Sequence, residues 1–166
     1  MLRPLAAVVL GYLVVVAVIM VSFTLLWTLM GQETAFRPGT TEVTWAWLAA
    51  TLPLNLAAAV AGGATAAWVA RSRALAGVLG LAGLMLVLGV AMALGQTGTP
   101  TSDAAITASA QLTAFEAAAH ARQPTWAAWM FPIVGMTGAL IGGGLVALRR
   151  ARRGRMIQGA HASVST

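Results

Sequence analysis

The composition excludes a water-soluble globular domain, because only 8% of the 166 residues are charged and 59% are apolar, whereas soluble domains carry about 25% charged residues. The net charge of +6 comes from ten basic residues, all arginine, and four acids that fall in short clusters between long uncharged stretches, as expected for a membrane protein. The absence of cysteine excludes disulfides, cysteine-ligated metal clusters and thiol catalysis.

Four apolar stretches predict transmembrane helices over residues 5–30, 45–70, 74–94 and 126–148. Each supplies the roughly 20 residues needed to cross about 30 Å of hydrocarbon. Backbone groups must bond internally in that medium, so these segments are expected to be helical. The first stretch is too long for a signal peptide, and no cleavage motif follows it. We therefore predict an all-α four-helix bundle forming a single transmembrane domain over residues 1–155.

The second stretch contains Pro53 and, two residues later, Asn55, the most polar side chain in any predicted span. Proline frees the carbonyl one turn back, and a neighbouring polar side chain can help to satisfy it. Local repair or an interhelical hydrogen bond is one interpretation of Asn55, and a polar point in a conduit or ligand site is the other. Pro132 is the corresponding kink candidate in the last helix.

Small residues recur at helical spacing in the second and fourth stretches. Because lipid tails provide no hydrophobic drive for association, transmembrane helices associate through close backbone packing at such residues. The helix-packing candidates are Gly62, Gly63, Gly138 and Gly142, of which the last two form a GxxxG motif. They are expected to pack within the bundle or to form an interface with an oligomer or a partner.

Between the third and fourth stretches, the sequence predicts a short periplasmic helix over about residues 102–121. Thr101, Ser102 and Asp103 are N-cap candidates at its start, and Pro124 follows its end. The helix is expected to lie along the membrane interface, either as a lid on the bundle or as a docking site.

The arginines predict the topology. Eight lie before the first stretch, between the second and third, and after the fourth, whereas the opposite side carries Arg37, Arg122 and all four acids. The arginine-rich side should be cytoplasmic, which places both termini in the cytoplasm of a bacterial inner membrane. Because topology explains the positive charge, no nucleic-acid partner is expected.

An arginine cluster follows the fourth stretch. It is interpreted as a stop-transfer signal that contacts anionic lipid headgroups or as a docking tail for a cytoplasmic partner. Its members are Arg149, Arg150, Arg152, Arg153 and Arg155. The remaining tail, residues 156–166, is expected to be disordered.

Six tryptophans lie near the predicted span ends, where amphipathic rings contact the headgroups. Five residues recur at one offset in the sequence: Trp47, Pro53, Gly63, Arg71 and Arg73 align with Trp126, Pro132, Gly142, Arg150 and Arg152. The tryptophans are interpreted as interfacial anchors or as stacking surfaces for a ligand. The repeat indicates two helical hairpins of the same orientation. Alternatively, every helix that runs from the outer to the inner side of the membrane needs similar residues at these positions.

The predicted spans contain no Asp, Glu, Lys, Arg or His, although proton and ion pathways usually need at least one such group. His120 and His161 lie outside the spans on opposite sides, and no nucleophile, base and orienting group come together. We therefore assign no catalytic, cofactor-binding or metal-ligating residue, and expect no enzyme. The expected function is an accessory or scaffold subunit that assembles with other membrane subunits or with itself. The alternative is an oligomeric channel or facilitator for an uncharged solute.

Two short motifs stand ahead of the inward-running helices. Phe36-Arg37-Pro38-Gly39 precedes Trp45, and Gln123-Pro124-Thr125-Trp126-Ala127-Ala128-Trp129 opens the last span. With these motifs the chain resembles a group of small bacterial four-helix inner-membrane proteins. The resemblance implies a four-helix bundle and brings no activity, cofactor or functional residue.

Overall fold

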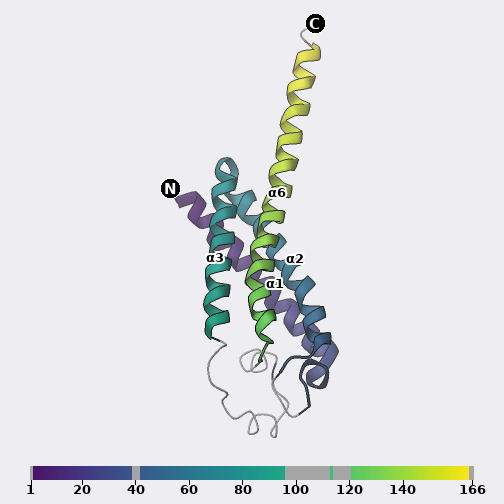
Figure 1. Cartoon of the computed structure of the whole chain (residues 1–166). Helices are drawn as coiled ribbons and strands as arrows, with labels where there is room; N and C mark the ends of the chain where they lie inside the picture. Colours follow the sequence, from purple (N-terminus) through teal and green to yellow (C-terminus); the bar gives the residue numbers. More distant parts are fainter. Residues whose placement is uncertain (1, 39–41, 96–112, 114–120, 165–166) are drawn as a thin grey trace.

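The computed structural model describes residues 2–38, 42–95, 113 and 121–164 (Figure 1). Its elements are α1 (Leu2–Ala35), α2 (Trp45–Ala70), the 3-10 turn η1 (Arg71–Arg73), α3 (Ala74–Gly95) and α6 (Thr125–Val164). Four helices in the described part are long and apolar enough to cross a membrane. The predicted all-helical architecture is confirmed at this level, and it indicates a multi-pass membrane protein.

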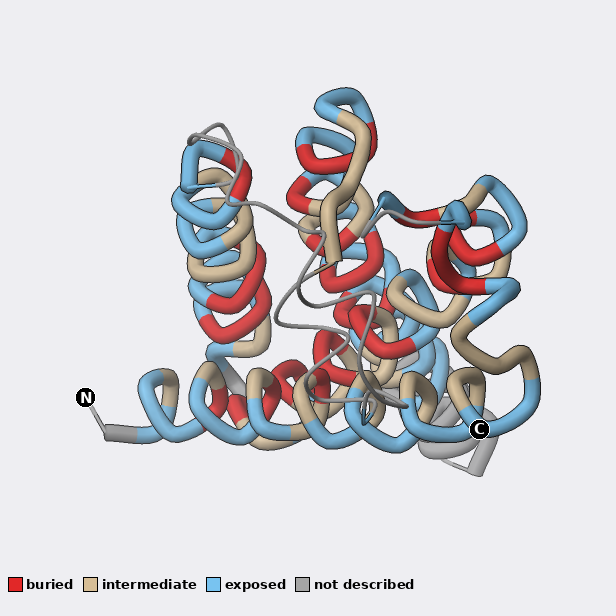
Figure 2. The backbone as a smooth tube through the Cα atoms, turned by 90° about the horizontal axis from the view of Figure 1, so that it is seen from below, coloured by how far each residue is buried: buried red, intermediate tan, exposed pale blue. Residues whose placement is uncertain are grey.

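The helix α2 lies between two neighbours, since it packs extensively against α6 on one side and α1 on another. The helix α3 packs mainly on α6, and α1 crosses the bundle obliquely (Figure 1). Buried positions face the neighbouring helices, whereas the outward faces are exposed (Figure 2). The N-terminus, η1 and the far end of α6 all lie at one end of the bundle (Figure 1).

The α2–α6 contact depends on glycine. A Cβ atom on Gly63 would collide with the backbone carbonyl of Ala139, and one on Gly142 would collide with that of Val60. At the start of both helices, the rings of Trp45 and Trp126 stack with centroids 5.0 Å apart. Contacts at successive levels therefore show that α2 and α6 run parallel, side by side.

A second close approach joins α1 to α2. A Cβ atom on Gly62 would lie 2.8 Å from the carbonyl oxygen of Gly11. Beside it, Val15 is 2% exposed and Leu81 of α3 is fully buried. Gly11 and Gly62 thus let α1 and α2 approach closely, and the Leu81 side chain of α3 packs against this contact.

The helix α1 is interrupted at Gly31, which has φ 72° and ψ 169°. A positive φ combined with an extended ψ is a conformation that essentially only glycine adopts, because glycine has no Cβ to clash. The chain then forms a further turn as far as Ala35, so α1 extends beyond the predicted end at residue 30.

At the same end, backbone hydrogen bonds hold the link between α1 and α2. The Thr44 amide donates to the Ala35 carbonyl at 2.9 Å and closes this link, and the Val43 amide donates to the carbonyl of Arg122, just before α6, at 3.0 Å. This pairing holds the α1–α2 link against the residues that precede α6. Beneath it lies a cluster of buried side chains from the α1–α2 link and from α1, α2 and α6: Ala35, Phe36, Val43, Trp47, Leu48 and Ala127.

The tryptophans do not share one environment. Trp47 is 4% exposed, and its ring meets that of Trp27 edge to face at 5.9 Å. Trp45 and Trp68, in contrast, are about two-thirds exposed, at 65% and 67%. Trp47 therefore packs between helices, and the exposed rings of Trp45 and Trp68 fit the expected interfacial position.

Two sequence predictions differ from the structure or fall outside it. The helix α6 continues to Val164, where a disordered tail was expected from residue 156. The stretch contains no proline, and an existing helix adds residues more easily than a new one nucleates. Of the predicted periplasmic helix at 102–121, the structure describes Thr113 and Ala121, and neither is helical; the remainder lies outside the described residues.

Candidate functional site

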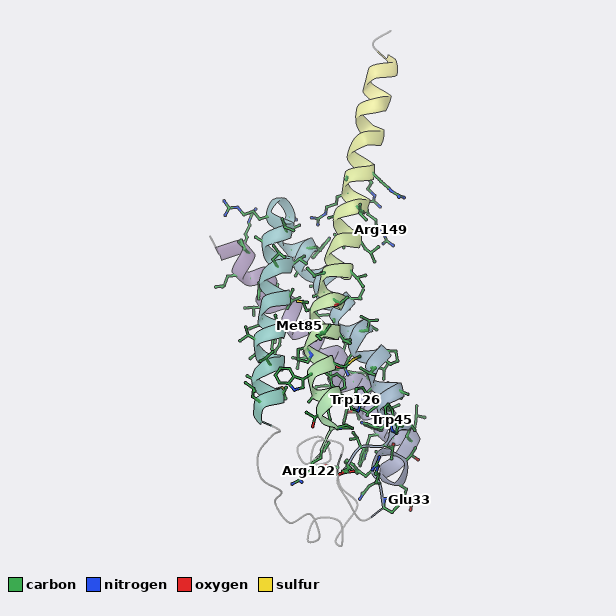
Figure 3. All side chains as sticks on the ribbon, in the orientation of Figure 1. Glu33, Trp45, Met85, Arg122, Trp126 and Arg149 are labelled. Atoms are coloured by element: carbon green, nitrogen blue, oxygen red, sulfur yellow. The ribbon has the colours of Figure 1, made fainter. Side chains whose placement is uncertain are left out.

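Two groups of polar side chains are candidates for a functional site. The first, called the arginine end, is the end of the bundle formed by the start of α1, by η1 and by α6 from Arg149 to Arg153. The second, called the recess, is a small space between α1 and α2 lined by Ile19, Ser22, Phe23, Leu26, Thr51, Leu54 and Asn55. Figure 3 places Arg149 toward the arginine end and Glu33 and Arg122 at the opposite end.

Arg150 connects α6 to the last turn of α2. Its guanidinium donates to the carbonyl oxygens of Ala67 at 3.1 Å, Trp68 at 3.2 Å and Arg71 at 3.3 Å. The last carbonyls of a helix lack intrahelical donors, and the negative end of the helix dipole favours a cation there. Arg150 therefore caps α2, a role that the sequence analysis missed when it grouped Arg150 with lipid and partner contacts. The only available signal was its alignment with Arg71 in the repeat.

The capped turn includes an unusual backbone conformation. Arg71 has φ 48° and ψ −102°. Among the residues that the structure describes, no other non-glycine residue has a positive φ. Such a conformation costs free energy for a residue with a Cβ and persists where its surroundings enforce it. The hydrogen bond from Arg150 to the Arg71 carbonyl is one such constraint. The α2–α3 turn and α6 thus form one connected unit.

Beyond Arg150, α6 leaves the bundle. Residues 151–164, called the α6 arm, stand clear of the other helices (Figure 1). Arg149, Arg152 and Arg153 are exposed. Arg155 lies on the arm, where the structure describes the helix but not this side chain. Of the five clustered arginines, then, one binds carbonyls and three others face outward.

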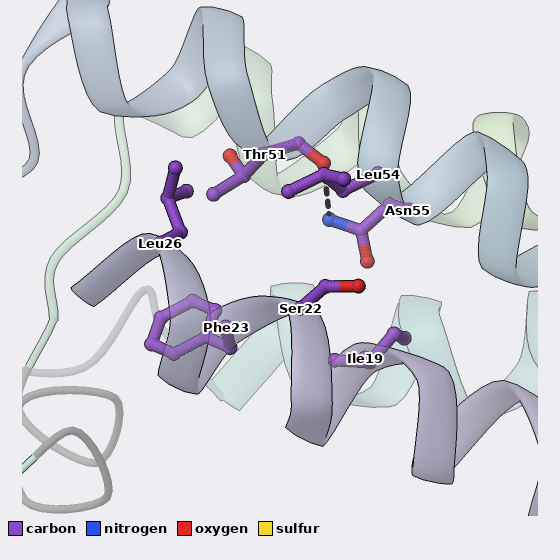
Figure 4. Close-up of a pocket in the computed structure, with 7 residues that line it drawn as sticks. All are labelled: Ile19, Ser22, Phe23, Leu26, Thr51, Leu54 and Asn55. Carbon is purple, nitrogen blue, oxygen red and sulfur yellow. Dashed lines mark hydrogen bonds between the residues drawn. The ribbon is translucent and has the colours of Figure 1, made fainter. Parts of the chain in front are cut away.

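The recess brings Asn55 of α2 opposite Ser22 of α1 (Figure 4). The Asn55 amide nitrogen donates to the Thr51 carbonyl at 2.9 Å, and the Thr51 hydroxyl donates to the Leu48 carbonyl at 3.3 Å. Pro53 frees the carbonyl of Ala49, four residues before it. The Asn55 bond is therefore local, as one interpretation expected, but it is made to a different carbonyl.

The kink candidates are not gathered around Asn55. Pro53 is exposed, whereas Pro132 is buried in the α3–α6 contact, where a Cβ atom on Gly89 would lie 2.7 Å from its ring. The four glycine candidates are buried at contacts within the bundle: Gly62, Gly63, Gly138 and Gly142. In this structure those surfaces are occupied by neighbouring helices of the same chain.

At the opposite end, Arg37 and Glu42 form an exposed ion pair at 3.2 Å, with both side chains more than half exposed at 57% and 56%. Such a pair contributes about 0–1 kcal/mol. Within the described residues, no three His, Asp or Glu side chains are grouped as metal ligands. The chemistry available at the described sites is therefore hydrogen bonding and the positive charge of arginine.

Comparison of the chain with protein-family models, with curated proteins and with solved structures finds no match. Its function is therefore argued from the geometry of the arginine end, the α6 arm and the recess.

Proposed function

We propose that the chain is a non-enzymatic membrane scaffold, an accessory subunit that docks a partner on the α6 arm. One observation carries the proposal. The helix α6 has 40 residues, or about 60 Å of length at 1.5 Å per residue, roughly twice the thickness of the hydrocarbon. A short helix without tertiary contacts is marginal in water, so an arm standing clear of the bundle (Figure 1) needs a partner to stabilise it.

The charge of the arm defines the chemistry of that partner. Arg149, Arg152 and Arg153 are exposed, and the sequence has no acid from residue 149 to the end of the chain. Anionic lipid headgroups contact the arginines nearest the bilayer. Because the arm extends roughly 20 Å further along its axis, its later turns are available to an acidic surface of another protein. That partner is a different membrane-associated subunit or a second copy of the chain.

We infer that the chain resides in a bacterial inner membrane with both termini in the cytoplasm. The start of α1, η1 and the far end of α6 share one end of the bundle, and these segments carry eight of the ten arginines. Cytoplasmic segments carry the excess of arginine in membrane proteins. In this orientation the α6 arm is in the cytoplasm, where a soluble or peripheral partner can reach it.

The proposal is tested by crosslinking in native membranes followed by purification in mild detergent. A photoreactive residue at Arg152 should trap a partner, and the same residue at Arg37, at the opposite end, should not. Replacing Arg152 and Arg153 by Gln should weaken recovery of the partner at least about tenfold, because the charge-assisted contacts are lost.

Removal of residues 156–166 distinguishes contacts with lipid headgroups from contacts with a protein partner. It leaves the arginines near the bilayer in place, so lipid contacts should persist while a protein partner of the arm is lost. Recovery of a lone monomer with the full chain, under several growth conditions, would refute the scaffold proposal.

The alternative is an oligomeric channel or facilitator for an uncharged solute. The observation that favours it is the recess, where Asn55 and Ser22 provide polar atoms between apolar helices. Because the recess in one chain has room for about one water, a path would have to form between copies. Solute flux into proteoliposomes that falls with Asn55→Leu supports this alternative, and flux that equals that of empty liposomes excludes it.

A further inference from the structure

The recess contains polar atoms that the chain itself does not pair. Asn55 uses its amide nitrogen on the Thr51 carbonyl, and Figure 4 shows its amide oxygen pointing toward the Ser22 hydroxyl. Within the described part of the chain, the structure records no hydrogen bond to that oxygen or from that hydroxyl. Two complementary groups thus face the same small space from different helices.

The depth of the recess makes this arrangement costly unless something fills it. Asn55 follows Trp45, which opens α2, by about 15 Å along the helix axis. This distance is half of the roughly 30 Å hydrocarbon thickness. At such a depth neither bulk water nor lipid headgroups can solvate the amide, and an unpaired polar group is unfavourable.

We propose that the recess binds one water molecule that bridges Ser22 of α1 to Asn55 of α2. The space open to the centre of a water molecule is about 10 Å³, close to the smallest volume that holds one water. The water accepts a hydrogen bond from the Ser22 hydroxyl and donates to the Asn55 amide oxygen. The Thr51 hydroxyl takes no part in the bridge, because it donates to the Leu48 carbonyl and points away from the Ser22 hydroxyl in Figure 4.

Other occupants fit less well. No charged side chain lines the recess, so a metal ion would lack the anionic ligands that hard cations require. The carbon atoms of an acyl chain would leave the Asn55 oxygen and the Ser22 hydroxyl unpaired. A buried water needs two to four polar partners, and the Ser22 hydroxyl and the Asn55 amide oxygen provide two.

The bridge joins α1 and α2 at a second position, separate from the Gly11–Gly62 contact. Close backbone packing holds one part of the crossing, and the water holds the part nearer the buried cluster that contains Trp47. The inference concerns this helix pair and is independent of what docks on the α6 arm.

The direct test is an experimental structure of the full chain in lipid nanodiscs, at a resolution that shows ordered water. We expect one density peak about 3 Å from both the Ser22 hydroxyl and the Asn55 amide oxygen. The peak should disappear in Ser22→Ala. A direct Ser22–Asn55 hydrogen bond, or acyl-chain density in the recess, would overturn the proposal.

Thermal unfolding in mild detergent provides the second test. Ser22→Ala or Asn55→Leu alone leaves the other group unpaired and should lower the Tm by about 2–4 °C. The double variant should recover most of that loss, because both polar groups are then absent. Additive losses, or single variants without effect, would contradict a shared water.

Thr24→Val is the matched control. Its hydroxyl lies on the same helix, is exposed, and donates to the Met20 carbonyl at 2.9 Å. Because this bond is local and outside the recess, the control should leave the Tm within about 1 °C. A drop equal to that of Ser22→Ala would assign the effect to the loss of any α1 hydroxyl, and so would overturn the bridge.

Discussion

At Gly31 the backbone of α1 adopts φ 72° with nothing within 4 Å of the position where a Cβ would stand. A side chain at position 31 would therefore meet no neighbouring atom, and its free-energy cost would come from the backbone conformation alone. Gly31→Ala should lower the free energy of unfolding by about 1–3 kcal/mol, because alanine is strained at this φ and ψ. Chemical unfolding in detergent measures the difference. In Gly144→Ala, a helical position that is equally open, stability should be unchanged or slightly higher, and a similar loss in both variants would contradict the argument.

At the scale of the elements, the α2–α6 pair has its closest approach at Gly63. A methyl group there meets the Ala139 backbone, which cannot rotate away. Gly63→Ala should therefore separate the two helices and destabilise the bundle by about 1–3 kcal/mol. Gly83→Ala, on α3 with nothing within 4 Å, is the control and should be neutral in the same unfolding experiment. Equal stability of the two variants would show that Gly63 does not set the spacing.

The cap that Arg150 places on α2 is the second contact between these elements. Arg150→Gln should reduce the free energy of unfolding by about 2 kcal/mol, since carbonyls at the end of α2 lose a charged donor. Arg152→Gln removes the same charge from an exposed position and should change stability by less than about 0.5 kcal/mol. If both substitutions act equally, the effect comes from net charge and not from the cap.

At the scale of the whole molecule, the apolar stretches predicted the four helices because span length and the absence of charge are local properties. The bounds of α2 matched within a residue, since Thr44 caps its start and accepts from the Trp47 amide at 3.2 Å. The Arg150 cap and the Ser22–Asn55 recess could not be predicted, because each joins residues from helices far apart in the sequence. Their pairing depends on how the helices rotate about their axes, which small-residue spacing alone does not define.

The central claim is that the chain crosses a bilayer four times with the arginine end in the cytoplasm. Because the chain has no cysteine, single cysteines at Thr34, Ser72 and Leu84 can be tested in intact cells with a membrane-impermeant maleimide. Thr34→Cys should be labelled from outside, Ser72→Cys only after the membrane is permeabilised, and Leu84→Cys in neither case. Labelling of Ser72→Cys in intact cells would invert the topology, and ready labelling of Leu84→Cys would contradict a membrane-spanning α3.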